Sequence, residues 1–203
     1  MNEVKHIVFD IGHVLLYWDP EVPFRTLIPD KKERTWFLAE VCSPAWNREQ
    51  DRGREWVDAE NLLIDQYPDY ADWIRAYRRD WMQMLTHRID GSIAVLEKLV
   101  ADGHDVTMLT NWHQDTFVEA RGHHAFLDIT RGVTVSGEVK LIKPDPAIYQ
   151  LHTRTFDLDP AHTLFFDDSP NNVQAAKDHG WQAELFTTPE ALQGDLRRYG
   201  VRL

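Results

Sequence analysis

The feature that most constrains the fold is a short apolar run near the N-terminus that ends abruptly in a carboxylate. Ile7, Val8 and Phe9 lead into Asp10, and apolar residues resume after Gly12. A run this apolar predicts a strand that is buried on both faces, as in a parallel sheet. Asp10 would then stand at the carboxyl end of the strand, where open α/β sheets bind their ligands. By itself, this aspartate is also explained as a turn cap.

Two more buried strands are predicted, over residues 106–109 and 163–166. Polar side chains stand at the ends of all three strands: Asp10, then Thr110 with Asn111, then Asp167 with Asp168. Helical patterns separate the strands, and this alternation predicts βαβ units and a parallel sheet. Parallel neighbours have their carboxyl ends at the same edge, so we expect these polar groups to meet in one crevice. That expectation makes Asp10 a site residue rather than a turn cap.

The rest of the core follows the same alternation. The sequence predicts helices over about 92–101, 114–121, 146–151, 169–180 and 187–199, and strands over 126–129, 133–136 and 181–186. Helix stop signals and first-turn prolines mark several of these ends. The fold class expected from this pattern is α/β, with a Rossmann-like parallel sheet.

A helical module is predicted between the first strand and the rest of the core. From about Phe24 to His87, no stretch is typical of a strand. Helical spacing of apolar residues occurs over 31–41, 55–67 and 70–85. Five of the eight tryptophans lie in this region, and we interpret them as the module's own core and its contact with the main domain. The predicted division is a core of residues 1–16 and 89–203 with a helical cap of residues 17–88.

Charge and cysteine content narrow the classes of partner. The chain has 22 basic and 33 acidic residues, a net charge of −11, which disfavours nucleic acid and anionic membrane surfaces. No apolar run approaches membrane-spanning length. Cys42 is the only cysteine, which rules out an internal disulfide and a cysteine-based zinc site. The first strand begins too early to leave room for a signal peptide, so we expect a cytoplasmic monomer or homodimer.

The predicted crevice is rich in carboxylates. Asp10, Asp167 and Asp168 would repel one another, and a hard divalent cation such as Mg²⁺ would relieve this repulsion. A nearby lysine would also help, and Lys143 and Lys140 are both candidates.

The polar residues after the second strand complete a possible phosphoryl site. Thr110 offers a hydroxyl and Asn111 an amide donor, both suited to anionic oxygens. Together with Mg²⁺ and a lysine, such donors can clamp a phosphoryl group. One carboxylate can then act as nucleophile and form an aspartyl-phosphate.

Four segments resemble, in order and spacing, the four motifs of the haloacid dehalogenase superfamily. They are Phe9-Asp10-Ile11-Gly12-His13-Val14, Leu109-Thr110-Asn111, Lys143-Pro144-Asp145-Pro146, and Phe166-Asp167-Asp168-Ser169 followed by Asn172. The motifs frame nearly the whole chain, and the ordered set is specific although each motif alone is weak. The inserted helices resemble the mobile cap of the subgroup that contains haloacid dehalogenases and many small-metabolite phosphatases.

The resemblance implies a role for each matching residue. Asp10 would be the nucleophile and a magnesium ligand, Gly12 a ligand through its carbonyl, and Asp168 a third ligand. Thr110 and Asn111 would hold phosphoryl oxygens. Lys143 would pair with both Asp10 and the phosphoryl group. Asp167 would lie beside Asp168, through a water or a hydrogen bond to Lys143, and Asn172 takes a place often held by a second aspartate.

Gly12 is a departure from the motif of most phosphatases in this superfamily, which have a second aspartate at this place. That aspartate protonates the leaving group and then activates water, a contribution of roughly 10²–10⁴-fold. One hypothesis is that His13 partly replaces it; the alternative is a turn histidine that binds a backbone carbonyl. The loop expected at residues 46–53 of the cap is either a substrate-selecting element, through Trp46, Arg48, Asp51 or Arg52, or a solvated turn.

Three functions remain open from the sequence. The first is Mg²⁺-dependent hydrolysis of a small phosphomonoester, with a small anionic metabolite as substrate. The second is a metal-independent 2-haloacid dehalogenase in which Asp10 attacks carbon. The third is a non-catalytic protein that binds a phosphorylated ligand or a protein partner. The Asp167–Asp168 pair favours the phosphatase, since the dehalogenase branch uses no metal.

Overall fold

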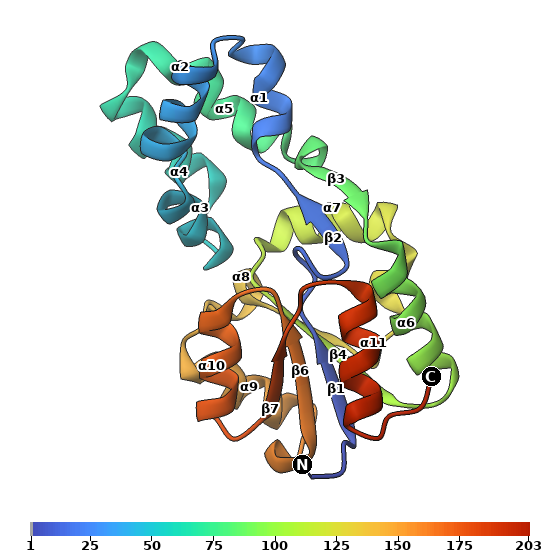
Figure 1. Ribbon diagram of the computed structural model, residues 1–203. Coiled ribbons are helices and arrows are strands. Elements are labelled where there is room, and N and C mark those ends of the chain that lie inside the picture. The colour runs from blue at the N-terminus through green and yellow to red at the C-terminus, as the bar shows by residue number, and fades with distance from the viewer. Residues whose placement is uncertain (1) are drawn as a thin grey trace.

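The computed structural model describes residues 2–203 and contains a five-stranded parallel sheet in the order β5-β4-β1-β6-β7 (Figure 1). The strands are β1 (His6–Phe9), β4 (Asp105–Thr110), β5 (Val133–Val135), β6 (Thr163–Asp167) and β7 (Gln182–Leu185). Every neighbouring pair in this sheet is parallel. The predicted α/β fold with a Rossmann-like parallel sheet is therefore confirmed.

Strand β1 occupies the middle of the sheet because its side chains can be buried on both faces. Ile7 and Phe9 belong to the larger hydrophobic cluster, whereas Val8, between them, belongs to the cluster on the other face. This is the two-residue alternation of a strand. Phe9 pairs in register with Met108 of β4 and with Phe166 of β6. The residues that follow these three strands are thereby brought to one edge of the sheet.

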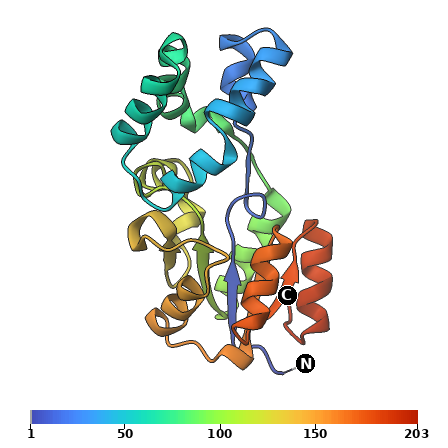
Figure 2. The same cartoon turned by 90° about the vertical axis from the view of Figure 1, so that its left-hand side faces the viewer.

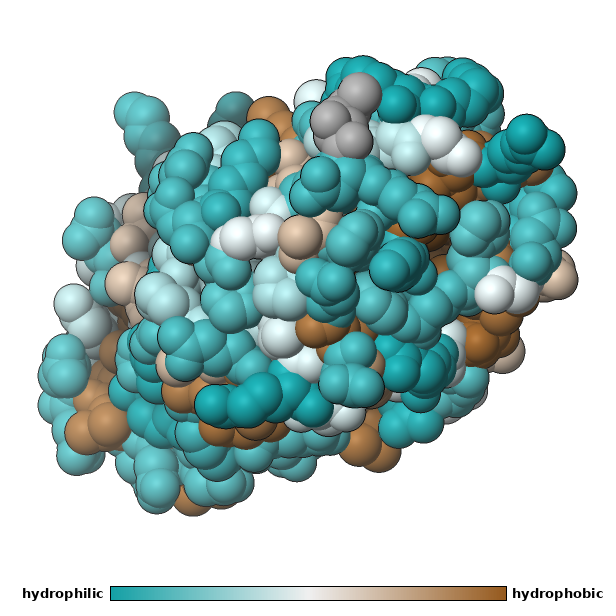
Figure 3. Space-filling model, turned by 90° about the horizontal axis from the view of Figure 1, so that it is seen from below, coloured by the Kyte–Doolittle hydropathy of each residue, from teal (hydrophilic) through white to brown (hydrophobic). Residues whose placement is uncertain are grey.

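Helices cover both faces of the sheet. Apolar residues of α6 (Asp90–Ala101), α7 (Gln114–His123) and α11 (Pro189–Arg198) join the larger cluster. Those of α9 (Pro146–Thr155) and α10 (Pro170–Asp178) join the other cluster. A short helix, α8 (Ser136–Val139), follows β5. Hydrophilic residues cover most of the face at the amino ends of the strands (Figure 3).

The helical module consists of five helices that lie beyond the carboxyl ends of the strands (Figures 1 and 2). They are α1 (Glu21–Leu27), α2 (Lys31–Trp36), α3 (Pro44–Asp51), α4 (Trp56–Gln66) and α5 (Ala71–Arg79). A π-helix (Phe37–Val41) and two 3₁₀ turns (Pro68–Tyr70, Trp81–Met84) complete the module. An antiparallel pair, β2 (Leu16–Trp18) and β3 (Leu85–Arg88), carries the chain out of the core and back.

Aromatic side chains form the interior of this module. Trp46 packs edge-on against Tyr77 at 5.2 Å between ring centroids, and Phe24 lies 5.3 Å from Phe37. Such pairs add to the free energy gained from burial alone. None of the helices in residues 2–203 combines the length and apolarity that a membrane-spanning helix needs.

Several sequence predictions of secondary structure are wrong. Residues 126–129 were expected to form a strand, but Ala125–Asp128 is a 3₁₀ turn in which neighbouring Phe126 and Leu127 are both buried. The helix expected over 70–85 ends at Arg79, and a 3₁₀ turn and strand β3 follow. Short elements of three to four residues carry too few side chains to show a period.

Helix α3 occupies part of the segment that was expected to be a loop. Ser43 caps it by accepting a hydrogen bond from the N–H of Trp46, and Pro44 takes the first helical position. Both are strong start signals for a helix. After Trp46 the helix contains only polar residues, so apolar side chains do not recur at helical spacing along it.

Candidate active site

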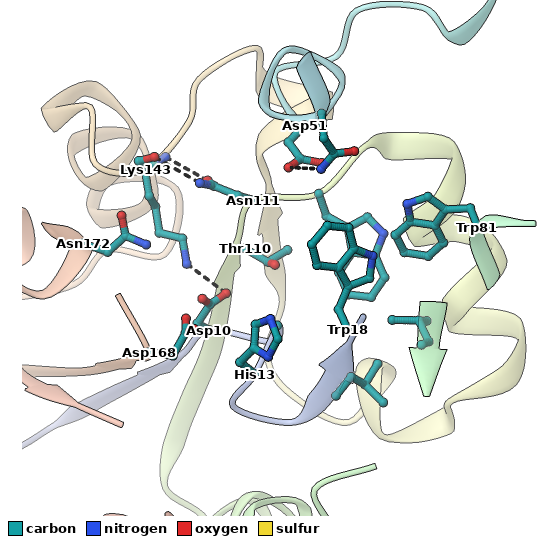
Figure 4. Close-up of a pocket in the computed structure, with 15 residues that line it drawn as sticks. Asp10, His13, Trp18, Asp51, Trp81, Thr110, Asn111, Lys143, Asp168 and Asn172 are labelled. Atoms are coloured by element: carbon teal, nitrogen blue, oxygen red, sulfur yellow. Dashed lines mark hydrogen bonds and ion pairs between the residues drawn. The ribbon is translucent and has the colours of Figure 1, made fainter. Parts of the chain in front are cut away.

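The ends of β1, β4 and β6 and the loop before α9 meet at one cavity of about 240 Å³ (Figure 4). Every residue predicted for the site lines it: Asp10, Gly12, Thr110, Asn111, Lys143 and Asp168. Asp167 lies beneath the cavity with no exposed surface. The crevice that the strand ends predicted is therefore present, with the expected side chains gathered in it.

Lys143 is the buried cation of the site. Its Nζ lies 2.9 Å from Asp10 Oδ1 and 2.6 Å from Asp167 Oδ2, and it donates a third hydrogen bond to the carbonyl of Leu109 at 2.9 Å. All three ammonium hydrogens are thus engaged. Burial opposes the charged form, but the two carboxylates outweigh it and raise the pKa of Lys143 above its usual value. The side chain is therefore a fixed positive charge.

Asp10 keeps one carboxylate oxygen available. Both groups that approach it from the described residues, the N–H of Ile11 at 2.7 Å and Lys143 Nζ, do so at Oδ1. Burial is the largest cause that raises the pKa of Asp10 well above its usual value, and Asp167 and Asp168 add to it while Lys143 opposes it. A further positive charge would restore the ionised, nucleophilic form.

Asp167 and Asp168 are neighbours in sequence with different environments. Asp167 accepts hydrogen bonds from Lys143, from Asn172 Nδ2 at 3.0 and 3.1 Å, and from the N–H of Ser169 at 2.8 Å. Asp168 is exposed and faces the cavity. Partial loss of solvent around its carboxylate, together with the charge of Asp167, raises the pKa of Asp168. Asp167 is thus occupied as an anchor for Lys143, and Asp168 is available to a ligand.

Three carboxylates of this cluster, from Asp10, Asp167 and Asp168, offer oxygen atoms within 4.8 Å of one another. Lys143 supplies one positive charge against three negative ones, so a divalent cation would balance the cluster. Carboxylate oxygens with a nearby backbone carbonyl, such as that of Gly12, are the donors that Mg²⁺ prefers. The residues present therefore fit a magnesium ion.

The Asn111 side chain makes two hydrogen bonds within the protein. Its Nδ2 donates to the carbonyl of Lys143 at 3.0 Å, and its Oδ1 accepts from the N–H of Lys143 at 2.8 Å. This reciprocal pair fixes the loop that carries Lys143, and one amide hydrogen of Asn111 remains for an anionic oxygen. Thr110 points into the cavity (Figure 4). Of the two lysines considered, Lys140 instead donates to the carbonyl of Gly53, so only Lys143 reaches the site.

The loop after β1 brings Gly12 and His13 to the cavity wall. A side chain at Gly12 would meet no atom within 4 Å at its Cβ position, so space does not require glycine there. His13 has a left-handed backbone (φ 54°), and its N–H donates to the carbonyl of Leu16 at 2.7 Å. Its ring contacts Tyr17 edge-on at 4.9 Å between centroids. The imidazole is thus held beside Asp10 (Figure 4).

The helical module contributes residues to the cavity wall, and the sequence predicted only some of them. Of the four residues proposed from segment 46–53, only Asp51 lines the cavity, together with Asn47 one turn earlier. Trp46 is buried inside the module, Arg48 donates to the carbonyl of Lys143 at 3.2 Å, and Arg52 lies 3.8 Å from Glu49. The i, i+4 spacing of 47 and 51 would have indicated a shared helix face.

Tryptophans form the apolar wall of the cavity. They are Trp18 from β2, Trp81 from a 3₁₀ turn, and Trp112 directly after Asn111. Trp81 and Trp112 pack at 5.4 Å between ring centroids, and the Nε1 of Trp112 donates to Thr116 Oγ1. These side chains come from three places in the sequence, so only the folded chain shows that they form one surface.

Comparison with known families agrees with this geometry. The family model described as a haloacid dehalogenase-like hydrolase matches residues 4–180. The chain belongs to the haloacid dehalogenase-like hydrolase family. The resemblance inferred from the four motifs is thereby confirmed, and the protein is a hydrolase.

Curated relatives of this hydrolase include proteins named for phosphate-ester hydrolysis. A sesquiterpene phosphatase of Aspergillus oryzae is 29% identical over 96% of this chain and 95% of its own length. A flavin mononucleotide hydrolase of Arabidopsis thaliana is 25% identical over 73% of this chain, and a glycerol-3-phosphatase of that plant is 26% identical over 88%. The chain spans just under two thirds of these two plant proteins, 63% and 62%.

Solved structures share the fold of this hydrolase. An enzyme of the same family from Bacteroides thetaiotaomicron, in complex with magnesium and inorganic phosphate, superposes with a TM-score of 0.70 at 20% identity, over 91% of this chain and 95% of that one. An L-2-haloacid dehalogenase from Xanthobacter autotrophicus superposes with a TM-score of 0.66 at 17% identity, over 98% and 85%. At these identities the likeness concerns the fold alone.

Proposed function

We propose that the protein is a Mg²⁺-dependent phosphatase that hydrolyses a small phosphomonoester through an aspartyl-phosphate on Asp10. The observation that carries the proposal is the free Oδ2 of Asp10 beside Lys143 Nζ, within a cluster of carboxylates that fits a divalent cation. The phosphatase names of the curated relatives support the same reaction class. Helices α1–α5 serve as the cap over this site.

Each residue has a task in this proposal. Asp10 Oδ2 attacks phosphorus, and Lys143 orients Asp10 and pairs with a phosphoryl oxygen. The Thr110 hydroxyl and the remaining amide hydrogen of Asn111 bind the other phosphoryl oxygens. Asp10, Asp168 and the carbonyl of Gly12 would hold Mg²⁺. When bound, the ion neutralises charge on the phosphoryl oxygens and so favours attack by an anion.

The charge of the site favours phosphatase over dehalogenase chemistry. A haloacid dehalogenase must hold the carboxylate of its substrate without a metal, and this cavity already has more carboxylates than cations. Among its lining residues, Lys143 is the only lysine or arginine, and Asp10 and Asp167 occupy it. A second anion would be repelled unless a divalent cation came with it.

The test is release of inorganic phosphate from a panel of sugar phosphates, nucleotides and acyl phosphates, with Mg²⁺ and with EDTA. We expect activity that EDTA abolishes and that Asp10→Asn lacks. Asp72→Asn is the matched control, because Asp72 is an exposed aspartate on α5. Chloride release from 2-chloropropionate in EDTA would overturn the proposal in favour of a dehalogenase. Absence of turnover of any substrate by a protein that binds Mg²⁺ would indicate a binding protein.

A further inference from the structure

We propose that Asp51, on helix α3 of the module, is a catalytic residue that protonates the leaving-group oxygen and later accepts a proton from the attacking water. The proposal rests on the phosphatase function proposed above. The loop after β1 offers no carboxylate for this proton transfer besides the nucleophile Asp10, because position 12 is glycine. Departure of an unprotonated alkoxide is slow, and general acid catalysis contributes roughly 10²–10⁴-fold in rate.

The cavity contains few groups that could transfer this proton. Its titratable lining residues are Asp10, His13, Asp51, Lys143 and Asp168. The proposed nucleophile and metal ligand account for Asp10 and Asp168, and all three hydrogens of the Lys143 ammonium are engaged. Only His13 and Asp51 are left.

Their positions distinguish these two groups. In-line attack sends the leaving oxygen away from the nucleophile, toward the opposite wall of the cavity. Figure 4 shows His13 beside Asp10, whereas Asp51 stands across the cavity, with Thr110 between them. Asp51 is therefore on the side where the leaving group must lie.

The surroundings of Asp51 suit proton transfer. Its Oδ2 accepts a hydrogen bond from Asn47 Nδ2 at 3.2 Å, and the backbone of His113 also faces its carboxylate. The other ionisable groups that face it are Arg48 on its own helix and Tyr77 of α5. Burial outweighs Arg48 and the hydrogen bond, and raises the pKa of Asp51 to about 7. Both protonation states are then populated near neutral pH, as an acid that must also act as a base requires.

The main chain of Asp51 is also fixed. Ser136 Oγ donates to its carbonyl, which connects the end of α3 to α8 in the core. Arg48 makes a second connection by donating to the carbonyl of Lys143. The carboxyl group is thus held at a defined place above the phosphoryl site although it belongs to the module.

Two residues that line the cavity have polar atoms without a partner. Asn47 Oδ1 and Trp18 Nε1 are buried, belong to residues that line the cavity, and have no hydrogen-bond partner in residues 2–203. A buried donor or acceptor without a partner costs free energy, and a bound ligand can remove this cost. The Asn47 side chain also donates to Asp51, so one of these atoms belongs to a residue in contact with the proposed acid.

The proposed steps balance as follows. Asp10 Oδ2 forms a bond to phosphorus while the bond from phosphorus to the ester oxygen breaks, and that oxygen takes its electron pair and the proton of Asp51. The alcohol leaves, and Asp51 is ionised. Water then attacks the phosphorus of the aspartyl-phosphate and gives a proton to Asp51. The acyl-phosphate bond breaks, which releases phosphate and restores both aspartates.

The test compares leaving groups in the first turnover, because release of the alcohol then reports cleavage of the ester bond alone. For Asp51→Asn with Mg²⁺, we expect a loss of roughly 10²–10⁴-fold with an alkyl phosphate such as propyl phosphate. With p-nitrophenyl phosphate, whose phenolate leaves without a proton, we expect a loss of less than about tenfold. Asp58→Asn, an exposed aspartate on α4, should match the wild type with both substrates.

A second variant separates loss of the acid from loss of structure. Position 12 has open space around the Cβ position, so Gly12→Asp can add a carboxylate in the loop after β1. In the Asp51→Asn background, Gly12→Asp should restore first-turnover cleavage of propyl phosphate by at least about tenfold. Recovery with this substrate and little change with p-nitrophenyl phosphate would support an acid role for Asp51.

Two outcomes would overturn the proposal while leaving the phosphatase intact. One is an equal loss with both substrates in Asp51→Asn, which would indicate a binding or structural role. The other is a loss selective for propyl phosphate in His13→Gln but not in Asp51→Asn, which would assign the acid to His13. If wild-type protein releases no phosphate from any ester, the phosphatase proposal fails, and the role of Asp51 fails with it.

Discussion

Lys143→Met removes the ammonium group that lies between Asp10 and Asp167. Lys143 is 1% exposed, and methionine fills a similar volume without a charge. The variant therefore isolates the contribution of charge from that of packing. After the substitution, the buried carboxylates face one another with no cation among the side chains that contact them.

The expected loss of stability is large. Removal of one partner from a buried ion pair costs about 3–5 kcal/mol, because the other charge stays buried without compensation. For a chain of this size, this corresponds to a melting temperature lower by roughly 10 °C. The loss should depend on pH, since burial already raises the pKa of Asp10. Protonation of Asp10 removes its repulsion with Asp167, so the stability deficit of the variant should be greatest near pH 7 and small near pH 4.

Denaturant unfolding followed by tryptophan fluorescence at both pH values measures this effect. Lys177→Met is the control, because Lys177 is exposed on α10. The double variant Lys143→Met/Asp167→Asn should recover part of the lost free energy at pH 7, since one of the uncompensated charges is gone. A Lys143→Met protein as stable as wild type at pH 7, or with the same deficit at pH 4, would refute the account of charge balance.

Three further predictions concern His152, Gly137 and the binding of Mg²⁺. Burial lowers the pKa of His152 to about 3. Because the unfolded chain binds a proton at this histidine below pH 6.5 and the folded protein does not, the free energy of unfolding should decrease by about 2 kcal/mol between pH 6.5 and 5. Urea unfolding of His152→Asn should not show this decrease. Gly137→Ala should lower the free energy of unfolding by about 1–3 kcal/mol, because the new Cβ would lie 2.7 Å from the backbone nitrogen of Gln114. Gly122→Ala is the control and should leave the stability unchanged, because no atom lies within 4 Å of its Cβ position. Mg²⁺ should raise the melting temperature of wild type, and Asp168→Asn should reduce this shift.

The fold of the core was predictable because strands that are buried on both faces consist almost entirely of apolar residues. The runs that end at Asp10 and at Thr110 have few polar residues, and their order along the chain predicts a parallel sheet with its carboxyl ends together. From that geometry, the gathering of residues 100 or more positions apart follows directly. Pairing details do not follow, as the contacts of Asn111 with the backbone of Lys143 show.

The module was less predictable because its contributions to the site come from polar or isolated residues. Helix α3 contains Asn47 and Asp51 on one face, and its apolar residues lie only in its first turn, so they do not recur at helical spacing. The indoles of Trp18 and Trp112 line the same cavity, although they are 94 positions apart in the sequence. A contact between distant side chains depends on how two elements pack, which a local pattern does not record.

The two adjacent aspartates at the end of β6 have different roles because their side chains point to opposite sides. Asp167 is the last residue of the strand and is fully buried, whereas Asp168, one residue later, is exposed in the cavity. Successive side chains of an extended chain point to opposite sides. The residue directed into the protein meets Lys143, Asn172 and a backbone N–H, and the one directed outward is left with two uncommitted oxygens. An exchange of aspartate for asparagine should therefore act mainly on stability at position 167 and mainly on Mg²⁺ affinity at position 168.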